Sequence, residues 1–283
     1  MDKVISGKSP LVLTGDHVSE HYGTVTVQDG GYIEVRADGF VTIDSLVISG
    51  NPAAPFIRVI GEKGADGASG QHGRDGNHGG TGANATCSSG GGEPGTPGGD
   101  GGAGANGADG SKGMNGEKGS PSPNLNITIT AISGEAMNGM TAISAGGAGG
   151  NGGDGGLGGD GGRGGDGGKY TGCVAYNSNG GNGGAGGLGG LGGSGGNGGN
   201  GGDGGVVTIS VPPAYNSLFL CKSYPAKGGK YGQGNWYGIG NIGGIGRASK
   251  TARNCGLSGS PGQIVGASGT SGASGSVGTI TIK

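Results

Sequence analysis

Residues 146–168 read GGAGGNGGDGGLGGDGGRGGDGG, an unbroken repeat of Gly-Gly-X. Glycine recurs at every third position in four further runs, and 84 of the 283 residues are glycine. Those runs are 61–82, 92–119, 180–204 and 266–278. A period of three is that of an extended polyproline-II-type helix, which rises about 3.1 Å per residue. The glycine period therefore decides the architecture.

Collagen and disorder are the two familiar explanations for such a composition. A collagen helix needs abundant proline, yet residues 61–119 contain only Pro94 and Pro97 and residues 146–168 contain none. Disorder is typical of Gly-rich segments, but the register is strict and the interruptions alternate as strands do. The alternating segments are 124–130, 206–211 and 279–282. Both explanations fit poorly.

A bundle of polyglycine-II helices within one chain fits better. Without side chains, extended helices can approach until backbone N–H groups donate to carbonyls of a neighbour, which satisfies their hydrogen-bonding needs. In Gly-Gly-X two faces are bare, and the third is expected to lie in water. That third face carries Asp154, Asp160, Arg163, Asp166 and Lys169. The runs 61–82 and 92–119 bear side chains on two faces, which predicts more exposed positions.

Residues 1–60 show a different pattern, an eight-residue repeat of short alternating strands. Its units begin at Gly23, Gly31 and Gly39, and a further strand is expected at 46–48. This predicts a β-meander or β-solenoid module over 1–60 that caps the bundle or docks to a partner, followed by a glycine-helix unit over 61–283. The expected fold class is mostly non-α, with short β-strands.

The termini, the cysteines and the charges add weaker constraints. Neither a signal peptide nor a run of 18 apolar residues is visible, which argues against conventional secretion and membrane insertion. Cys87, Cys173, Cys221 and Cys255 leave open two disulfides in any of three pairings, or free thiols. No Asp or Glu follows residue 205, and this basic end favours an anionic partner or serves solubility alone. No nucleic-acid-binding motif is present.

Aromatic residues cluster between 170 and 237, in the breaks between glycine runs. Loops on a rigid scaffold commonly carry binding sites, and Tyr and Trp give large contact areas at low entropic cost. Plugs that cover the ends of the bundle are the alternative. The candidate receptor-binding residues are Tyr170, Tyr176, Tyr215, Phe219, Tyr224, Lys230, Tyr231, Trp236 and Tyr237.

Catalytic and metal sites have little support in the sequence. Residues 149–154 match the start of a calcium-binding nonapeptide, but the large apolar residue due at its eighth position is Gly156. No Cys/His spacing for zinc is present, and the four histidines stand in no catalytic motif. We expect no enzyme activity, no metal and no cofactor.

Gly-rich runs interleaved with aromatic loops resemble the tip adhesins of long tail fibres in T-even-like phages. The resemblance covers residues 61–283, through the five runs and the loops 83–91, 120–145, 169–179, 206–240 and 247–258. It implies a virion protein, made in the host cytoplasm and acting outside the cell, whose loops bind an outer-membrane protein or lipopolysaccharide. It also implies a trimeric fibre tip reached through residues 1–60, although that part does not resemble the family's attachment sequence.

Two alternatives remain. The stretch 64–70 is similar to repeats of the glycine-rich antifreeze proteins of springtails, which are disulfide-linked polyglycine-II bundles. Their ice-binding faces need flat arrays of small residues, whereas runs 146–168 and 180–204 present Asn, Asp, Leu and Arg. The other alternative is a toxin or surface protein that uses the bundle as a scaffold.

Overall fold

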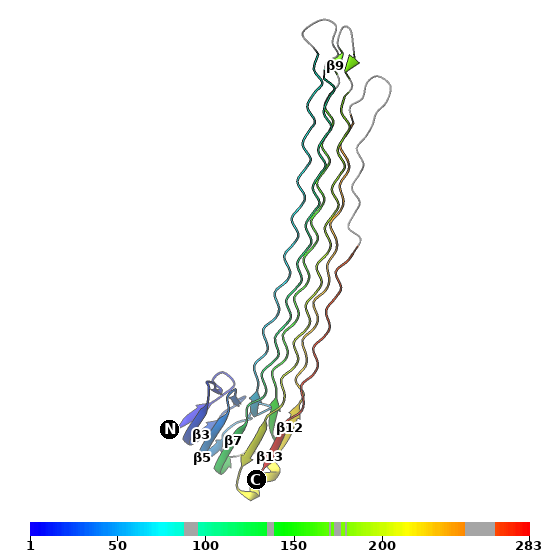
Figure 1. Cartoon of the computed structure of the whole chain (residues 1–283). Coiled ribbons are helices and arrows are strands. Elements are labelled where there is room, and N and C mark those ends of the chain that lie inside the picture. Colours follow the sequence, from blue (N-terminus) through cyan, green and yellow to red (C-terminus); the bar gives the residue numbers. More distant parts are fainter. Residues whose placement is uncertain (88–95, 135–138, 170, 173–176, 179, 247–263) are drawn as a thin grey trace.

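The computed structural model describes residues 1–87, 96–134, 139–169, 171–172, 177–178, 180–246 and 264–283. Two β-sheets form one end of the molecule, and long extended segments run away from them and return (Figure 1). The described residues contain one short 3-10 helix, η1 (Pro213–Leu218), and no α-helix. The expectation of a mostly non-α fold with short β-strands is confirmed.

Parallel strands make up both sheets, and successive strands alternate between them. The six-stranded sheet has the order β1 (Lys3–Ile5), β3 (Val18–Val27), β5 (Gly39–Ile48), β7 (Leu125–Gly134), β11 (Val206–Ser210), β13 (Thr279–Ile282). The five-stranded sheet has the order β2 (Leu11–Leu13), β4 (Ile33–Val35), β6 (Ile57–Ile60), β8 (Met140–Ala145), β12 (Phe219–Tyr224). A small antiparallel pair, β9 (Thr171–Gly172) and β10 (Asn177–Ser178), lies at the opposite end of the molecule (Figure 1).

The hydrophobic core is built from the alternating inward residues of these strands. Val41, Ile127 and Ile209 are each at most 1% exposed and belong to one cluster. They come from β5, β7 and β11, so both the core and the sheets cross the expected boundary at residue 60. Whether residues 1–60 fold as a separate module stays a prediction.

Six extended segments, here called segments I to VI, are present in the described part of the chain. They are I (61–84), II (98–122), III (146–169), IV (180–205), V (226–246) and VI (264–278). Segments I, III and V follow strands of the five-stranded sheet, whereas II, IV and VI precede strands of the six-stranded sheet. The chain therefore leaves through one sheet and returns through the other.

Backbone hydrogen bonds between segments repeat every three residues. The N–H groups of Gly64 and Gly67 donate to the carbonyls of Ala148 (2.9 Å) and Asn151 (2.7 Å), which joins segment I to III. Equivalent series run from III to V, from II to IV and from IV to VI, and each segment also donates to the one before it. The segments thus form two layers, I–III–V and II–IV–VI, and each layer continues one sheet.

Glycine is required where two backbones meet. In segment III a Cβ atom at Gly155 would overlap the Gly193 carbonyl of IV, and one at Gly156 would overlap the Gln71 carbonyl of I. In segment I the contact falls on one glycine per triplet, as at Gly73, whereas a Cβ at Gly80 would have no atom within 4 Å. Two glycines per triplet therefore mark a segment enclosed on two sides.

The prediction of recognition loops is wrong for two of the five stretches. Residues 120–145 contain β7 and β8, and residues 206–240 contain β11, η1, β12 and most of segment V. Segment V does not show a strict glycine repeat, because Asn235 and Asn241 occupy positions at which the three-residue period has glycine. The N–H groups of both asparagines still donate to segment IV, at Gly193 and Gly187.

The cysteines do not form two disulfides. Cys87 is disulfide-bonded, whereas Cys221 on β12 is a free thiol. Burial raises the pKa of the Cys221 thiol above its ordinary value. Cys173 and Cys255 lie outside the described residues.

Candidate functional site

Segment V offers the side chains on which a binding site can be built. One residue per triplet faces the neighbouring segments, and the glycines at this position, such as Gly229, Gly232 and Gly238, are buried. The third residue of each triplet points outward and is exposed. This outward row consists of Lys227, Lys230, Gln233, Trp236, Ile239, Ile242 and Ile245.

The outward row changes character halfway along the segment. Near the sheets it is cationic and polar, with Lys227, Lys230 and Gln233. Farther out it is apolar: the residues Trp236, Ile239, Ile242 and Ile245 are 65%, 67%, 59% and 46% exposed. The Trp236 and Tyr237 rings pack edge to face, with their centroids 6.4 Å apart.

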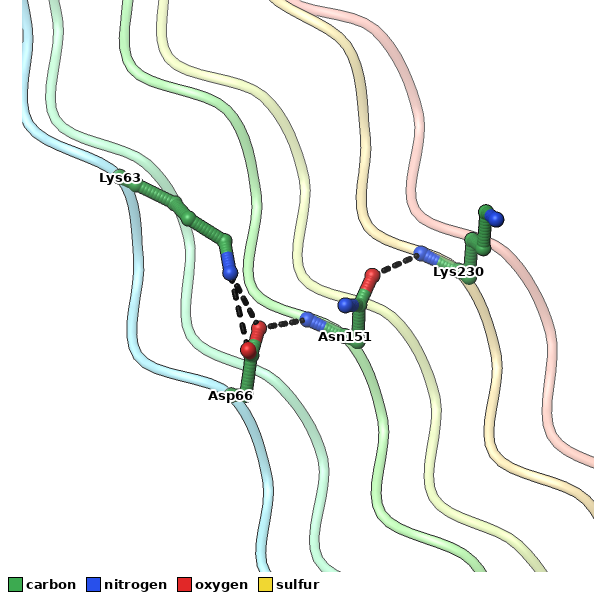
Figure 2. A network of polar contacts seen from close by, with 4 residues as sticks. All are labelled: Lys63, Asp66, Asn151 and Lys230. Carbon is green, nitrogen blue, oxygen red and sulfur yellow. Dashed lines mark hydrogen bonds and ion pairs between the residues drawn. The ribbon is translucent and has the colours of Figure 1, made fainter.

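Asp and Asn side chains position this row by bonding its backbone. Among the described residues, the N–H groups of these outward residues have no backbone acceptors. Side-chain oxygens of the adjacent segment III accept several of them instead. Asn151 accepts from the Lys230 N–H (3.0 Å) and itself donates its N–H to Asp66 (2.6 Å), which also bonds Lys63 (Figure 2). The same contact joins Asp154 to Gln233 (2.7 Å) and Asp160 to Ile239 (2.7 Å).

Segment V compensates where segment III has no acceptor. Leu157 and Arg163 interrupt the row of Asn and Asp on segment III. At those two levels the acceptors come from segment V itself: Asn235 bonds the Trp236 N–H (2.9 Å), and Asn241 bonds the Ile242 N–H (2.8 Å). The two asparagines that break the glycine period are thus explained by hydrogen bonding.

These contacts lower carboxylate pKa values. The pKa of Asp66 is lowered, chiefly by the Lys63 ammonium and then by the Asn151 N–H. The pKa of Asp203 is lowered chiefly by the backbone N–H of Ser276 and then by its hydroxyl. The solvated polar face expected from the sequence is therefore also a hydrogen-bonding element of the fold.

The structure separates the nine predicted site residues into three groups. Phe219 is 8% exposed and belongs to the core, and Tyr215 on η1 packs against that core, so Phe219 is not available to a receptor. Tyr170 and Tyr176 lie outside the described residues. The remaining five lie along the end of β12 and segment V: Tyr224, Lys230, Tyr231, Trp236 and Tyr237.

Sequence reasoning missed Ile239, Ile242 and Ile245. Their spacing of three residues from Trp236 matches the glycine period, and that spacing was the available signal. The sequence predicts a loop over 206–240, and in a loop a spacing of three residues does not place side chains on one face.

A recess lies where the sheets meet the segments. This cavity of about 340 Å³ is lined by Asp16, Arg36, Asp38 and the 121–123 Pro-Ser-Pro stretch, among others. Arg36 is bound by Glu34 at 2.7 Å, and Asp38 accepts the Asn124 N–H at 2.7 Å. Two of its charged side chains are therefore already engaged within the protein.

Other kinds of site were sought over the same described residues. They contain no group of three His, Cys, Asp or Glu side chains placed to hold a metal ion. None of their helices is long and apolar enough to cross a bilayer.

Comparisons with known proteins identify no family. No protein-family model and no curated protein matches the chain. Among solved structures, the chain is weakly similar to the nine polyproline type II helical bundle springtail antifreeze protein from Granisotoma rainieri. The identity is 22% over 77% of this chain and 95% of that chain, with a TM-score of 0.11. A likeness of this size carries no argument about fold or function.

Proposed function

We propose that the protein is a non-enzymatic, receptor-binding spike whose stiff shaft is a polyglycine-II bundle. The three-residue repeat of inter-segment hydrogen bonds supports this assignment of segments I to VI. We further propose that the alternation of strands between two parallel sheets is a β-solenoid from which the bundle grows.

The observation that carries the proposal is the placement of the ends. Both termini lie in the sheets, whereas the described residues that flank the first two outer connections, 84–87 with 96–98 and 169 with 180, lie at the far end of the shaft (Figure 1). A chain wound in this way can be attached by its base while it displays its far end. The dense backbone bonding between segments would hold that far end in a fixed position.

By its resemblance to phage long-tail-fibre tip adhesins, the proposed partner is a bacterial surface receptor, an outer-membrane protein or lipopolysaccharide. The base, including residues 1–60, would attach to a trimeric fibre tip, and the protein would act in the virion outside the cell. The exposed Tyr231 and Trp236 supply aromatic contact area on the shaft itself, and the exposed Tyr224 lies at its base, at the end of β12.

An ice-binding role has less support. The outward row of segment V mixes Lys, Gln, Trp and Ile, and that of segment III mixes Asn, Asp, Leu and Arg. Small residues follow one another only on segment VI among the outward rows compared: Ala267, Thr270, Ala273 and Ser276.

Binding of the labelled protein to a panel of Gram-negative strains tests the proposal. The panel includes mutants that lack single porins or carry truncated lipopolysaccharide. Strain-selective binding that one such mutant abolishes is the expected result. Absence of binding to every strain, with inhibition of ice recrystallisation by the same sample, would replace the adhesin proposal with the antifreeze one.

A further inference from the structure

Resting on the proposed receptor-binding function, we propose that the far half of segment V is a receptor contact that takes an extended polypeptide strand. The surface, called the V edge below, comprises Trp236, Tyr237 and residues 239–245. Its ligand would be a stretch of a protein receptor that offers free carbonyl groups and apolar side chains.

The first observation is the apolar row of the V edge. Trp236, Ile239 and Ile242 are each more than half exposed, and Ile245 is 46% exposed. Spaced by three residues on one face, they lie in line rather than scattered. Contiguous apolar rows of this kind on a soluble surface mark interaction sites.

The second observation is an unfinished series of hydrogen bonds. In segment III the N–H groups of Gly158, Gly161 and Gly164 donate to the carbonyls of Trp236, Ile239 and Ile242. The equivalent groups in segment V are the N–H groups of Tyr237, Gly240 and Gly243. They have no acceptor among the residues that the structure describes.

The V edge can therefore accept one more extended strand. Its three N–H donors follow one another at about 9 Å, three residues of rise. Gly240 and Gly243 carry no side chain and are partly exposed, so a partner backbone can approach them closely. The carbonyls of such a strand would continue the pattern that already joins III to V, as in strand addition at a sheet edge.

Two other occupants meet physical obstacles. A lipid acyl chain would cover the isoleucines but leave the three N–H groups buried without acceptors, which is costly. A second copy of this chain has carbonyls at the right spacing along segment I. However, β4 and β2 extend the five-stranded sheet beyond β6, from which segment I starts, so a parallel copy that placed its segment I beside segment V would bring these two strands onto β12.

Paired variants test the side chains and the N–H groups separately. Ile239→Ser with Ile242→Ser removes the apolar row, and Gln233→Ser is its control on the same face. Gly240→Pro removes one donor while keeping an extended backbone, and Gly240→Ala keeps the donor. The readouts are the apparent Kd for intact cells of a strain that the wild type binds, and the melting temperature.

The double serine variant and Gly240→Pro are expected to bind about tenfold or more weakly, with unchanged melting temperatures. Gln233→Ser and Gly240→Ala should bind as the wild type does. Cells whose surface proteins were removed by protease should lose binding, and vesicles of that strain's outer-membrane lipids should show none.

The opposite results are distinct. Wild-type binding by the double serine variant places the contact elsewhere while the adhesin function stands, and equal loss in Gly240→Pro and Gly240→Ala removes the strand-like pairing. Binding to lipid vesicles that the serines abolish identifies a lipid occupant, and serine-sensitive self-association in sedimentation identifies a second copy. If the wild type binds no strain, the proposed function itself fails.

Discussion

Single glycines differ sharply in what they contribute, and the difference depends on what lies beyond the Cα atom. Gly156 donates its N–H to Ser111 (2.9 Å), accepts from Gly193 (2.8 Å) and faces the Gln71 carbonyl. Gly80 faces open space. Although both belong to glycine-rich runs, only the first is enclosed by other backbones.

Gly156→Ala is expected to destabilise the fold by about 2 to 4 kcal/mol, because the new methyl group pushes segments apart and inter-segment hydrogen bonds are lost. Gly80→Ala should be neutral or slightly stabilising, since it restricts the unfolded chain and meets nothing. Thermal unfolding of the two variants side by side measures the contrast. Equal melting temperatures would mean that the segments are not in close backbone contact.

Asp203 links stability to pH. Its Oδ1 accepts the N–H (2.9 Å) and the hydroxyl (2.8 Å) of Ser276, and its pKa is lowered in the folded state. A lowered folded-state pKa means that this contribution is present above about pH 4 and is lost as the pH falls through the lowered value. Acidification should therefore lower the melting temperature.

Asp203→Asn keeps an oxygen acceptor but cannot titrate. Its melting temperature should fall less than that of the wild type between pH 6 and pH 3. Scanning calorimetry at both pH values makes the comparison, and an identical fall in the two proteins would show that Asp203 does not contribute to the acid sensitivity.

At the scale of elements, the side-chain acceptors of one segment are matched to the backbone N–H donors of its neighbour. Segment III supplies acceptors to segment V through Asn151, Asp154 and Asp160, and segment V supplies its own where III has Leu157. Asn235 also donates its amide to the Gly155 carbonyl at 3.0 Å. The outward positions of one segment therefore constrain the composition of the next.

This matching predicts a coupling between two residues in different segments. Asn235→Gly alone should cost about 1 kcal/mol, since the Trp236 N–H loses its acceptor. In a Leu157→Asp background the loss should be much smaller, because an aspartate at that position would bond the N–H as Asp160 bonds that of Ile239. Unfolding free energies of the four proteins in the cycle give the coupling, and simple additivity would contradict it.

The extent of sequence-based prediction differs from element to element. The enclosed position of segment III follows from its two glycines per triplet, and the contacts of Gly155 and Gly156 agree with it. The sequence predicts a loop where segment V lies, because asparagine replaces glycine at two positions and interrupts the three-residue period. Which segments pair across layers depends on the whole winding, which no local pattern records.

The candidate site divides in the same way. Trp236 and Lys230 were singled out as aromatic and basic, and both are exposed. Phe219 lies in the core because β12 alternates between core and solvent, with Phe219 buried and Leu220 54% exposed. The sequence identifies Phe219 as an aromatic residue, but the direction in which its side chain points depends on the position of Phe219 in strand β12.

At the scale of the whole molecule, shape is the most direct test of the architecture. A shaft of about 24 residues per segment at about 3.1 Å each, with the strands beyond it, spans roughly 100 Å. A compact chain of 283 residues would measure about 50 Å across. Small-angle scattering should give a maximum dimension near the larger value, and the smaller one would exclude an extended shaft.

The alternation of the chain between two layers has a consequence for biosynthesis. Among the described residues, the backbone hydrogen bonds of each segment join it to segments one or two places away in the chain, as III bonds to I, II, IV and V. The strands follow a similar order, with β3 between β1 and β5 and β4 between β2 and β6. When a segment emerges from the ribosome, its earlier partners have therefore already been made, and the shaft can be assembled in the direction of translation.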